Sequence, residues 1–269
     1  MSPPIRLQTL GAVQVITIDA PQRRNALTPE MLCRLADAFI AFARDPALRV
    51  AVVTGTGEQA FCAGGDLART LPLLTGDRAP EDDWDRRLLG DPLVLAASSL
   101  RDFPLDKPVV AAINGSCMAA GFELMLGTDI RIAARHAQFG LPEVQRALLP
   151  FAGSMVRLPR QVPHVIAMRL LLTGEAIDAD EALRVGLVNE VVAGAEVMPR
   201  AMAIAERIAR NGPLAVQAVK RTAVATSGMS LTEAFAIEDT AKREVLATAD
   251  AREGPRAFIE KREPRYEGR

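Results

Sequence analysis

The order of the expected secondary structure constrains the fold of this chain more than any other feature. Short β-branched runs at Val50–Thr54, Val109–Ile113 and Asp129–Ala133 are typical of buried strands, and Ala119–Leu126 between the last two has a helix-forming composition. From about residue 165 onward the periodic segments indicate helices alone. Strands that alternate with helices and then give way to helices predict an α/β core followed by a helical C-terminal part, and we place the boundary between residues 197 and 198.

The flanking segments complete this expected order. Ile5–Thr9 and Val13–Asp19 alternate around Gly11 and predict a hairpin. A helix is expected from Thr28 to about Arg44, because threonine caps a helix N-terminus well and the following proline fits its first position. The proline-rich and acidic segment 71–92 has the weakest core pattern and predicts a mobile surface stretch, helical toward its end. The expected later helices are Ile166–Leu172, Asp180–Val185, Ala201–Arg210, Pro213–Val224, Leu231–Leu246 and Glu253–Arg262.

Composition excludes several classes of function. The net charge of −1 gives no long-range attraction to nucleic acid or to an anionic membrane. Aromatic residues make up only 4% of the chain, too few to favour a stacking platform for single-stranded nucleic acid. Three cysteines without a CxxC spacing favour neither a disulfide framework nor a zinc site. With no signal peptide or membrane-spanning run expected from the sequence, we predict a soluble protein of a reducing, cytoplasmic compartment.

Two glycine-containing segments follow predicted strands and lead into predicted helices. In residues 61–67 (Phe-Cys-Ala-Gly-Gly-Asp-Leu) the glycines would let the backbone approach a ligand, although a tight turn capped by Asp66 explains the same residues. Residues 114–123 are mostly small, which also suits close helix packing. Glu123 is the unusual member, because a carboxylate in an apolar helix is costly unless it is solvated, paired or used in chemistry.

A second acid, Glu143, follows a glycine and a proline in Phe139–Glu143 (Phe-Gly-Leu-Pro-Glu). Taken alone, Glu143 is an ordinary loop residue and Glu123 a partner of its helix dipole. Taken together, the two acids lie in apolar contexts near two turns that offer backbone donors. Carboxylates that share an apolar pocket push their pKa values apart, which gives one proton donor and one acceptor near neutral pH.

The other chemically active residue types carry weaker patterns. His136 and His164 are the only histidines and predict surface or capping roles. Cys62 and Cys117 have no histidine nearby in either motif, so we interpret them as small core residues. Trp84, the single tryptophan, is expected to be a local packing anchor.

Several of these segments in this order resemble the crotonase superfamily, which is the enoyl-CoA hydratase/isomerase family. The resemblance rests mainly on Phe61–Asp66, on Lys107–Gly115 with Gly121–Glu123, and on Phe139–Glu143, and it extends over essentially the whole chain. It implies a spiral of repeated ββα units with a helical C-terminal trimerisation region. It also implies a homotrimer, or a dimer of trimers, that acts on acyl-CoA thioesters without a metal or a separate cofactor.

The resemblance further implies a role for individual residues. The backbone amides of Ala63 and Ala120 would form an oxyanion hole, and Glu123 with Glu143 would hold water and move its proton. Phe258 and Lys261 would reach the nucleotide of CoA, often across a subunit boundary. The residues expected to bind CoA or the substrate are Arg24, Ala63, Gly64, Gly65, Asp66, Leu67, Gly121, Phe258 and Lys261.

The chain departs from the family pattern at two places. Ala119-Ala120-Gly121 replaces a run of three glycines, and an alanine Cβ disfavours positive φ. The acidic segment between Asp66 and Lys107, which borders the acyl pocket in this family, is longer than in short-chain hydratases. Retention of both Glu123 and Glu143 favours hydration of a 2-enoyl-CoA. The alternatives are enoyl isomerisation, thioester hydrolysis, dehalogenation or, in another class, a non-catalytic RNA-binding homologue.

Overall fold

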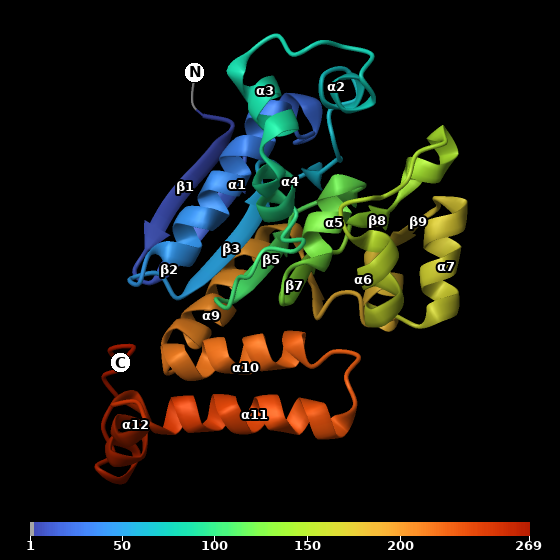
Figure 1. Cartoon of the computed structure of the whole chain (residues 1–269). Helices are drawn as coiled ribbons and strands as arrows, with labels where there is room; N and C mark the ends of the chain where they lie inside the picture. Colours follow the sequence, from blue (N-terminus) through green and yellow to red (C-terminus); the bar gives the residue numbers. More distant parts are fainter. Residues whose placement is uncertain (1–2) are drawn as a thin grey trace.

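The computed structural model describes residues 3–269, and its largest feature is a six-stranded sheet (Figure 1). The first two strands form the predicted antiparallel hairpin, and every further neighbour in the sheet is parallel. The central strands are covered on both faces, which is why their sequences are continuous apolar runs rather than alternating ones. The strand order is β1 (Ile5–Leu10), β2 (Val13–Ile18), β3 (Val50–Gly55), β5 (Val109–Ile113), β7 (Ile130–Ala134) and β10 (Glu190–Val192).

A second sheet of four short strands lies beside the first. Its order is β4 (Ala60–Cys62), β6 (Ser116–Met118), β8 (Gln138–Gly140) and β9 (Ala176–Asp178). The pairs β3/β4, β5/β6 and β7/β8 each place one strand in each sheet, and helical turns follow each pair. The chain therefore winds as a spiral of ββα units, and the predicted crotonase-type fold is confirmed. The short strands escaped prediction because three residues cannot display a period of two.

Helix α1 (Pro29–Arg44) covers the N-terminal half of the large sheet and begins and ends where the sequence predicts. The Thr28 hydroxyl accepts a hydrogen bond from the Met31 amide at 3.3 Å, as an N-cap should. Near its C-terminus, Lys107 Nζ donates to the Phe42 and Asp45 carbonyls, at 2.9 and 2.5 Å. Side chains therefore bond free backbone groups at both ends of the helix: Thr28 from the adjoining residue and Lys107 from a distant part of the chain.

The segment 71–92 is helical toward its end, as predicted, but it has more structure and more buried residues than a surface stretch would. It folds into α2 (Thr70–Thr75), α3 (Asp83–Gly90) and the start of α4 (Pro92–Ser98), and α3 and α4 pack against α1. Leu73, Leu88 and even Asp85 are buried. Such short helices give too few turns for a periodic pattern, and the acids among them mask their apolar positions.

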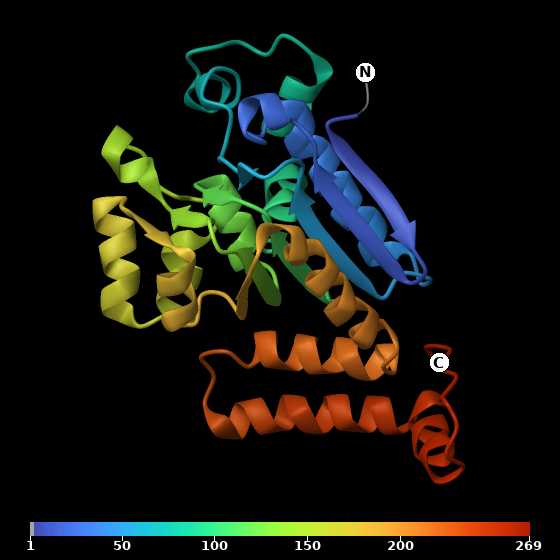
Figure 2. The same cartoon turned by 180° about the vertical axis from the view of Figure 1, so that it is seen from behind.

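The helices after β8 form two groups. Helices α6 (Ser154–Gln161), α7 (His164–Thr173) and α8 (Ala179–Arg184) pack beside the small sheet. Helix α9 (Val197–Ala209) crosses the large sheet and buries Ala201 and Ala205 completely. Helices α10 (Pro213–Ala225), α11 (Leu231–Leu246) and α12 (Asp250–Ile259) project from the body (Figure 2).

Two of the C-terminal helices depart from their predicted ranges. Helix α9 begins at Val197 rather than at Ala201, and α12 spans Asp250–Ile259 rather than Glu253–Arg262. Within the described residues, no helix combines the length and the apolar character that crossing a membrane requires. The projecting helices expose many large apolar side chains: Val219, Val224, Leu231, Phe235, Leu246, Phe258 and Ile259.

Candidate active site

The first strand-to-helix turn starts at the end of β4 and brings the backbone of residues 63–66 beside residues 24–27. Leu27 donates its amide to the Gly64 carbonyl at 2.8 Å, and the Asp66 amide donates back to Leu27 at 2.9 Å. The Asp66 carboxylate accepts from the amides of Ala68 and Arg69, at 2.9 and 3.0 Å. It therefore closes the turn before α2 rather than capping the helix itself, whose N-cap is Arg69. Asp66 also pairs with Arg23 at 2.9 Å.

The second turn, before α5 (Ala120–Leu126), lies directly against the first. A Cβ added to Gly64 would lie 2.7 Å from the Ala119 Cβ, and one added to Gly121 would lie 2.5 Å from the Cys62 carbonyl oxygen. Both glycines therefore permit close contact between the turns. Gly121 is buried against Cys62 and does not line the pocket described below. Close packing between the two turns therefore explains a glycine at this position better than the predicted ligand contact does.

The strain expected from alanines in this turn falls on Ala119 rather than on Ala120. Ala119 has φ 51° and ψ −125°, a conformation that side-chain-bearing residues rarely adopt, whereas Ala120 is the first helical residue of α5. The Glu123 amide bonds the Ala119 carbonyl at 2.9 Å, which fixes the turn onto the helix. The turn thus has a positive φ at residue 119, which glycine adopts easily, although the residue is alanine.

The two predicted oxyanion donors differ in their present hydrogen bonds. The Ala120 amide has no acceptor within residues 3–269, because it is one of the free N–H groups of the first turn of α5. The Ala63 amide donates to the Arg24 carbonyl at 3.1 Å. Both residues line the same pocket, but only the Ala120 donor is free in this structure.

Glu123 lies one helical turn into α5, and its side chain is almost completely buried. Its Oε1 accepts a hydrogen bond from the Ser154 amide at 3.4 Å. Burial, together with the negative charge of Glu143, raises the pKa of Glu123 to about 7, and hydrogen bonds from residues 152 and 154 only partly oppose this rise. A carboxyl group with such a pKa can both give and take a proton near neutral pH.

Glu143 reaches the same pocket from the short helix η2 (Pro142–Arg146). Burial raises its pKa, and the Arg146 guanidinium offsets part of that effect. Its Oε2 is buried without a hydrogen-bond partner among the described residues. The structure therefore brings the two predicted acids together, and one of them holds an acceptor atom ready for a ligand or a water molecule.

The pocket between these groups is mainly apolar and has a volume of about 200 Å³. One side consists of the catalytic candidates, namely Ala63, Ala120, Glu123 and Glu143. The remaining lining residues are mainly aliphatic and hydroxyl side chains from α2, α4 and the loop after η2. These are Leu67 just before α2, and Thr70, Leu71, Leu74, Leu95, Ser98, Ser99, Leu148, Leu149, Phe151 and Ala152. Arg146, at the end of η2, is the only cation among the described residues that line the pocket.

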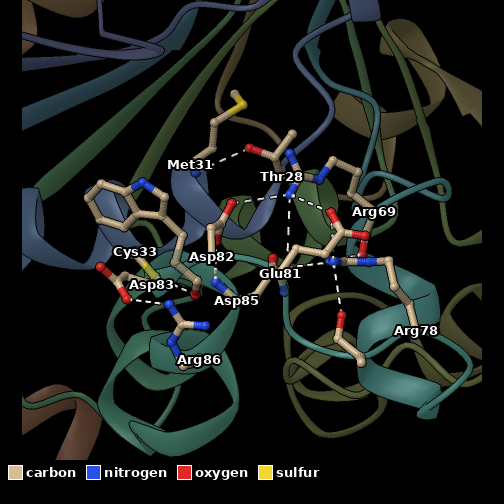
Figure 3. Close-up of polar contacts among 12 residues, drawn as sticks. Thr28, Met31, Cys33, Arg69, Arg78, Glu81, Asp82, Asp83, Asp85 and Arg86 are labelled. Carbon is tan, nitrogen blue, oxygen red and sulfur yellow. Dashed lines mark hydrogen bonds and ion pairs between the residues drawn. The ribbon is translucent and has the colours of Figure 1, made fainter.

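The α2 wall of this pocket is held by a group of charged residues that we call the 69–85 ion cluster: Arg69, Arg78, Glu81, Asp82 and Asp85 (Figure 3). Arg78 contacts Asp85 at 2.5 Å and donates to the Arg69 carbonyl at 3.0 Å. Arg69 in turn pairs with Asp82 at 3.2 Å. The hydrogen bond from Arg78 holds the pKa of the buried Asp85 at about 2. The cluster thus fixes residue 69, next to the pocket-lining Thr70, onto α3.

The predicted CoA-binding residues are only partly gathered in one chain. Ala63, Gly65 and Leu67 line the pocket, and exposed Arg24 lies beside it through its bond to Ala63. Phe258 and Lys261 lie at the far end of the molecule on and after α12, where Phe258 is 86% exposed. Within one chain they do not approach the pocket, so their contribution across a subunit boundary stays a prediction.

The weaker candidates occupy structural positions. Burial raises the pKa of the Cys62 thiol to about 12, and that of Cys117 is raised well above its usual range, so neither is a ready nucleophile. Trp84 packs on the core beneath Arg34, whose guanidinium lies 4.9 Å from the ring centre, and its anchor role is confirmed. His136 is exposed and bonds the Glu58 carbonyl at 2.8 Å. Sequence reasoning missed Ser154 and the α2 leucines, because nothing in their local pattern separates them from loop residues.

Comparisons with known proteins show the family of this chain. The profile of the enoyl-CoA hydratase/isomerase family matches residues 8–269. The chain is 40% identical to a carnitinyl-CoA dehydratase of Proteus mirabilis, with both chains covered in full. It is 39% identical to the enoyl-CoA hydratase EchA19 of Mycobacterium tuberculosis, covering 99% of this chain and 97% of that protein.

A solved structure of a putative enoyl-CoA hydratase/isomerase from Mycobacterium abscessus is 41% identical and superposes with a TM-score of 0.88, covering 99% of this chain and all of that one. An enoyl-CoA hydratase structure from Mycobacterium tuberculosis is 36% identical, has the same TM-score and covers both chains in full. Sequence similarity and fold similarity therefore both extend over nearly the whole chain. This protein belongs to the enoyl-CoA hydratase/isomerase family.

Proposed function

We propose that this protein catalyses the reversible addition of water to a 2-enoyl-CoA, which gives a 3-hydroxyacyl-CoA. The observation that carries the proposal is the meeting of Glu123 and Glu143 with the free Ala120 amide in one mainly apolar pocket. Water must lose one proton as its oxygen bonds to the β-carbon, and the α-carbon must gain one. Two carboxyl groups with raised pKa values suit this pair of proton transfers.

The oxyanion hole supplies the electrostatic part of the mechanism. Negative charge develops on the thioester oxygen when water adds, and a preorganised amide stabilises it because the donor is already oriented. The Ala120 amide meets this need directly. The Ala63 amide would contribute by sharing its proton between the substrate oxygen and the Arg24 carbonyl that now accepts it at 3.1 Å.

The pocket walls favour an uncharged, aliphatic acyl group. The leucines of α2 and of the loop after η2 offer only dispersion and hydrophobic contact. Arg146 is the one cation among the lining residues and would repel a positively charged acyl group such as carnitinyl. We therefore favour an apolar enoyl chain over the substrate in the name of the Proteus relative.

A spectrophotometric screen tests this function. The purified protein would be given straight-chain and branched 2-enoyl-CoA thioesters, and the loss of the enoyl absorbance would be followed. Carnitinyl-CoA would be tested in the dehydration direction, and 3-enoyl-CoA thioesters would report isomerisation. We expect hydration of at least one aliphatic 2-enoyl-CoA. Turnover of 3-enoyl-CoA alone, with every 2-enoyl-CoA left unchanged, would assign the site to isomerisation instead.

We further propose that the active protein is a trimer or a dimer of trimers. The projecting helices α10–α12 expose large apolar side chains, among them Phe235 at 57% and Phe258 at 86%, that a monomer leaves in water. Burial against a neighbouring subunit would cover this surface and would bring Phe258 and Lys261 to a neighbour's pocket. Light scattering of the full chain checks the assembly, and a stable monomer would contradict it.

A further inference from the structure

Glu123 has an unusual requirement for its hydrogen-bond partners. The residue is 3% exposed, and burial raises the pKa of its carboxyl group to about 7, so both protonation states are populated around neutrality. The hydrogen bond to its Oε1 comes from the Ser154 amide at 3.4 Å. An amide can only donate, so it stabilises the carboxylate but offers nothing to the proton of the carboxylic acid.

The hydroxyl of the same residue, Ser154, is the complementary group. Ser154 is fully buried at the first position of α6, and its Oγ makes no hydrogen bond of regular geometry among residues 3–269. Its side chain is nevertheless close enough to Glu123 to lower the pKa of that carboxyl group. A buried hydroxyl without a partner costs about 1–3 kcal/mol, so its retention needs an explanation. The backbone of this turn is fixed, because the Gly153 carbonyl accepts from the amides of Val156 and Arg157 at 3.2 and 2.9 Å. The Ser154 hydroxyl can therefore change its hydrogen-bond partner only by rotation of the short side chain.

We propose that the Ser154 hydroxyl is an adjustable partner of the Glu123 carboxyl group, donating to the carboxylate and accepting from the carboxylic acid. A hydroxyl can do both because it carries one donor and two acceptor positions. Ser154 does not line the pocket and therefore touches no substrate. It is a positioning residue that acts through Glu123. The proposal rests on the proposed hydration, in which Glu123 changes its protonation state.

Three other charged groups act on Glu123 or on its partner carboxyl group. Glu143, on η2, raises the pKa of Glu123 by its negative charge. The negative charge of Glu123 acts to raise the pKa of Arg157, on α6, but the Arg157 guanidinium donates to the carbonyls of Ser99 and Leu100. Arg146, on η2, acts on Glu143. Neither arginine can accept a hydrogen bond from Glu123, as the serine hydroxyl can.

The first experiment measures Glu123 directly in the resting full-length protein. Glutamate carboxyl carbons would be labelled with ¹³C and titrated by NMR, and the Glu123 resonance would be assigned by its loss in Glu123→Gln. Ser154→Ala removes the hydroxyl and keeps the amide. A hydroxyl donates more strongly to a charged carboxylate than it accepts from a neutral carboxylic acid, so we expect the pKa of Glu123 to rise by about 0.5–1 unit, the equivalent of one hydrogen bond. Ser154→Thr retains a hydroxyl and should restore the wild-type value.

Kinetic and control variants complete the test. In Ser154→Ala the acidic limb of the kcat/KM profile should move upward with the NMR value, and kcat should fall more than KM changes. Thr128→Ala is the matched control, because Thr128 is also buried, lies just after α5 and bonds the Met125 carbonyl at 2.7 Å. It should lower stability without moving the Glu123 titration. Ser154→Gly provides a second variant without the hydroxyl if the alanine variant folds poorly.

The outcomes separate this inference from the proposed function. An unchanged Glu123 pKa in a folded Ser154→Ala or Ser154→Gly protein would overturn the role of Ser154, whatever the enzyme activity. A shifted pKa in a protein that hydrates no enoyl-CoA would support the role of Ser154 and reject the hydratase function.

Discussion

The two walls of the pocket are built from different interactions. The catalytic wall, formed by residue 63, α5 and η2, is anchored by parallel strands, main-chain hydrogen bonds and a buried apolar core. The α2 wall is anchored by the 69–85 ion cluster, in which most side chains reach solvent (Figure 3). Close packing holds reacting groups within narrow limits, whereas ion pairs near the surface contribute less and respond to pH and salt. The chemistry and the acyl selectivity of this enzyme should therefore respond to different substitutions.

The largest effect is expected from the acids of the catalytic wall. Glu123→Gln and Glu143→Gln should each lower kcat for hydration by about 10²–10⁴-fold, the usual contribution of a general acid or base. The double variant should lose much less than the product of the two single losses, because the acids act as a unit. Steady-state kinetics on the best enoyl-CoA would measure this. Near-normal activity of either single variant would exclude the two-carboxylate mechanism.

The same glutamine variant should change stability in a direction opposite to activity. The folded-state pKa of Glu123, about 7, lies above the unfolded value of about 4.3. The stability that its neutral form contributes is therefore fully present below about pH 4.3 and is lost as the pH rises through 7. We expect Glu123→Gln to be more stable than the wild type at pH 8, and the difference to shrink toward pH 5 in urea unfolding.

The next largest effect concerns the free amide of the catalytic wall. Ala120→Pro removes this N–H, while proline at the first position of a helix is otherwise well tolerated. Loss of one oxyanion donor should lower kcat by about 100-fold. Ala120→Ser keeps the amide and serves as the control, and circular dichroism checks the fold of both. If the folded proline variant turns over normally, Ala120 is not an oxyanion donor.

The α2 wall should respond with a smaller change, and in KM rather than kcat. Asp85→Asn weakens the contact with Arg78 that ties α2 to α3, so the leucines on α2 should lose their fixed positions. We expect kcat/KM for the best acyl chain to fall about tenfold, equivalent to ~1.4 kcal/mol. The control is Asp83→Asn, on the same helix, where an exposed pair with Arg86 should contribute almost nothing. A fall in kcat alone would mean that the α2 wall takes part in the chemistry.

The effect of the Asp85 pair on stability has a defined pH window. Because the pKa of Asp85 is lowered to about 2, its contribution is present above the unfolded value of about 3.9 and is lost as the pH falls toward 2. The stability difference between wild type and Asp85→Asn should therefore be constant above pH 5 and should shrink at lower pH. A difference that instead grows on acidification would contradict the ion-pair assignment.

The smallest effect is expected from the strained turn. Ala119 has φ 51°, so Ala119→Gly should relieve strain and raise the free energy of unfolding by about 1 kcal/mol. Ala120→Gly provides the contrast, because position 120 is helical and gains nothing from glycine. Urea unfolding of the two variants would measure the difference. A more stable Ala120→Gly protein would show that the strain lies at the other alanine.

Local pattern predicted much of the fold and the site, for reasons visible in particular segments. Some elements have either a periodic apolar pattern over several residues or a clear capping residue, and both can be recognised in the sequence. These are the hairpin, α1, the buried strands and α11. Glu123 and Glu143 stood out because an acid in an apolar context is costly. The three-residue strands and the burial of Asp85 were not predictable, because neither leaves a periodic pattern.

The sequence by itself determined the order of strands and helices, the two acids and the two glycine-containing turns. These features depend on residue type and on neighbours within a few positions. Tertiary structure alone decided that the strain falls on Ala119. It also decided that the Ala63 amide donates to the Arg24 carbonyl and that the Ser154 amide donates to the Glu123 carboxyl group. Each of these depends on contacts between segments that are distant in the chain, or on a backbone conformation that those contacts impose, and residue type alone specifies neither.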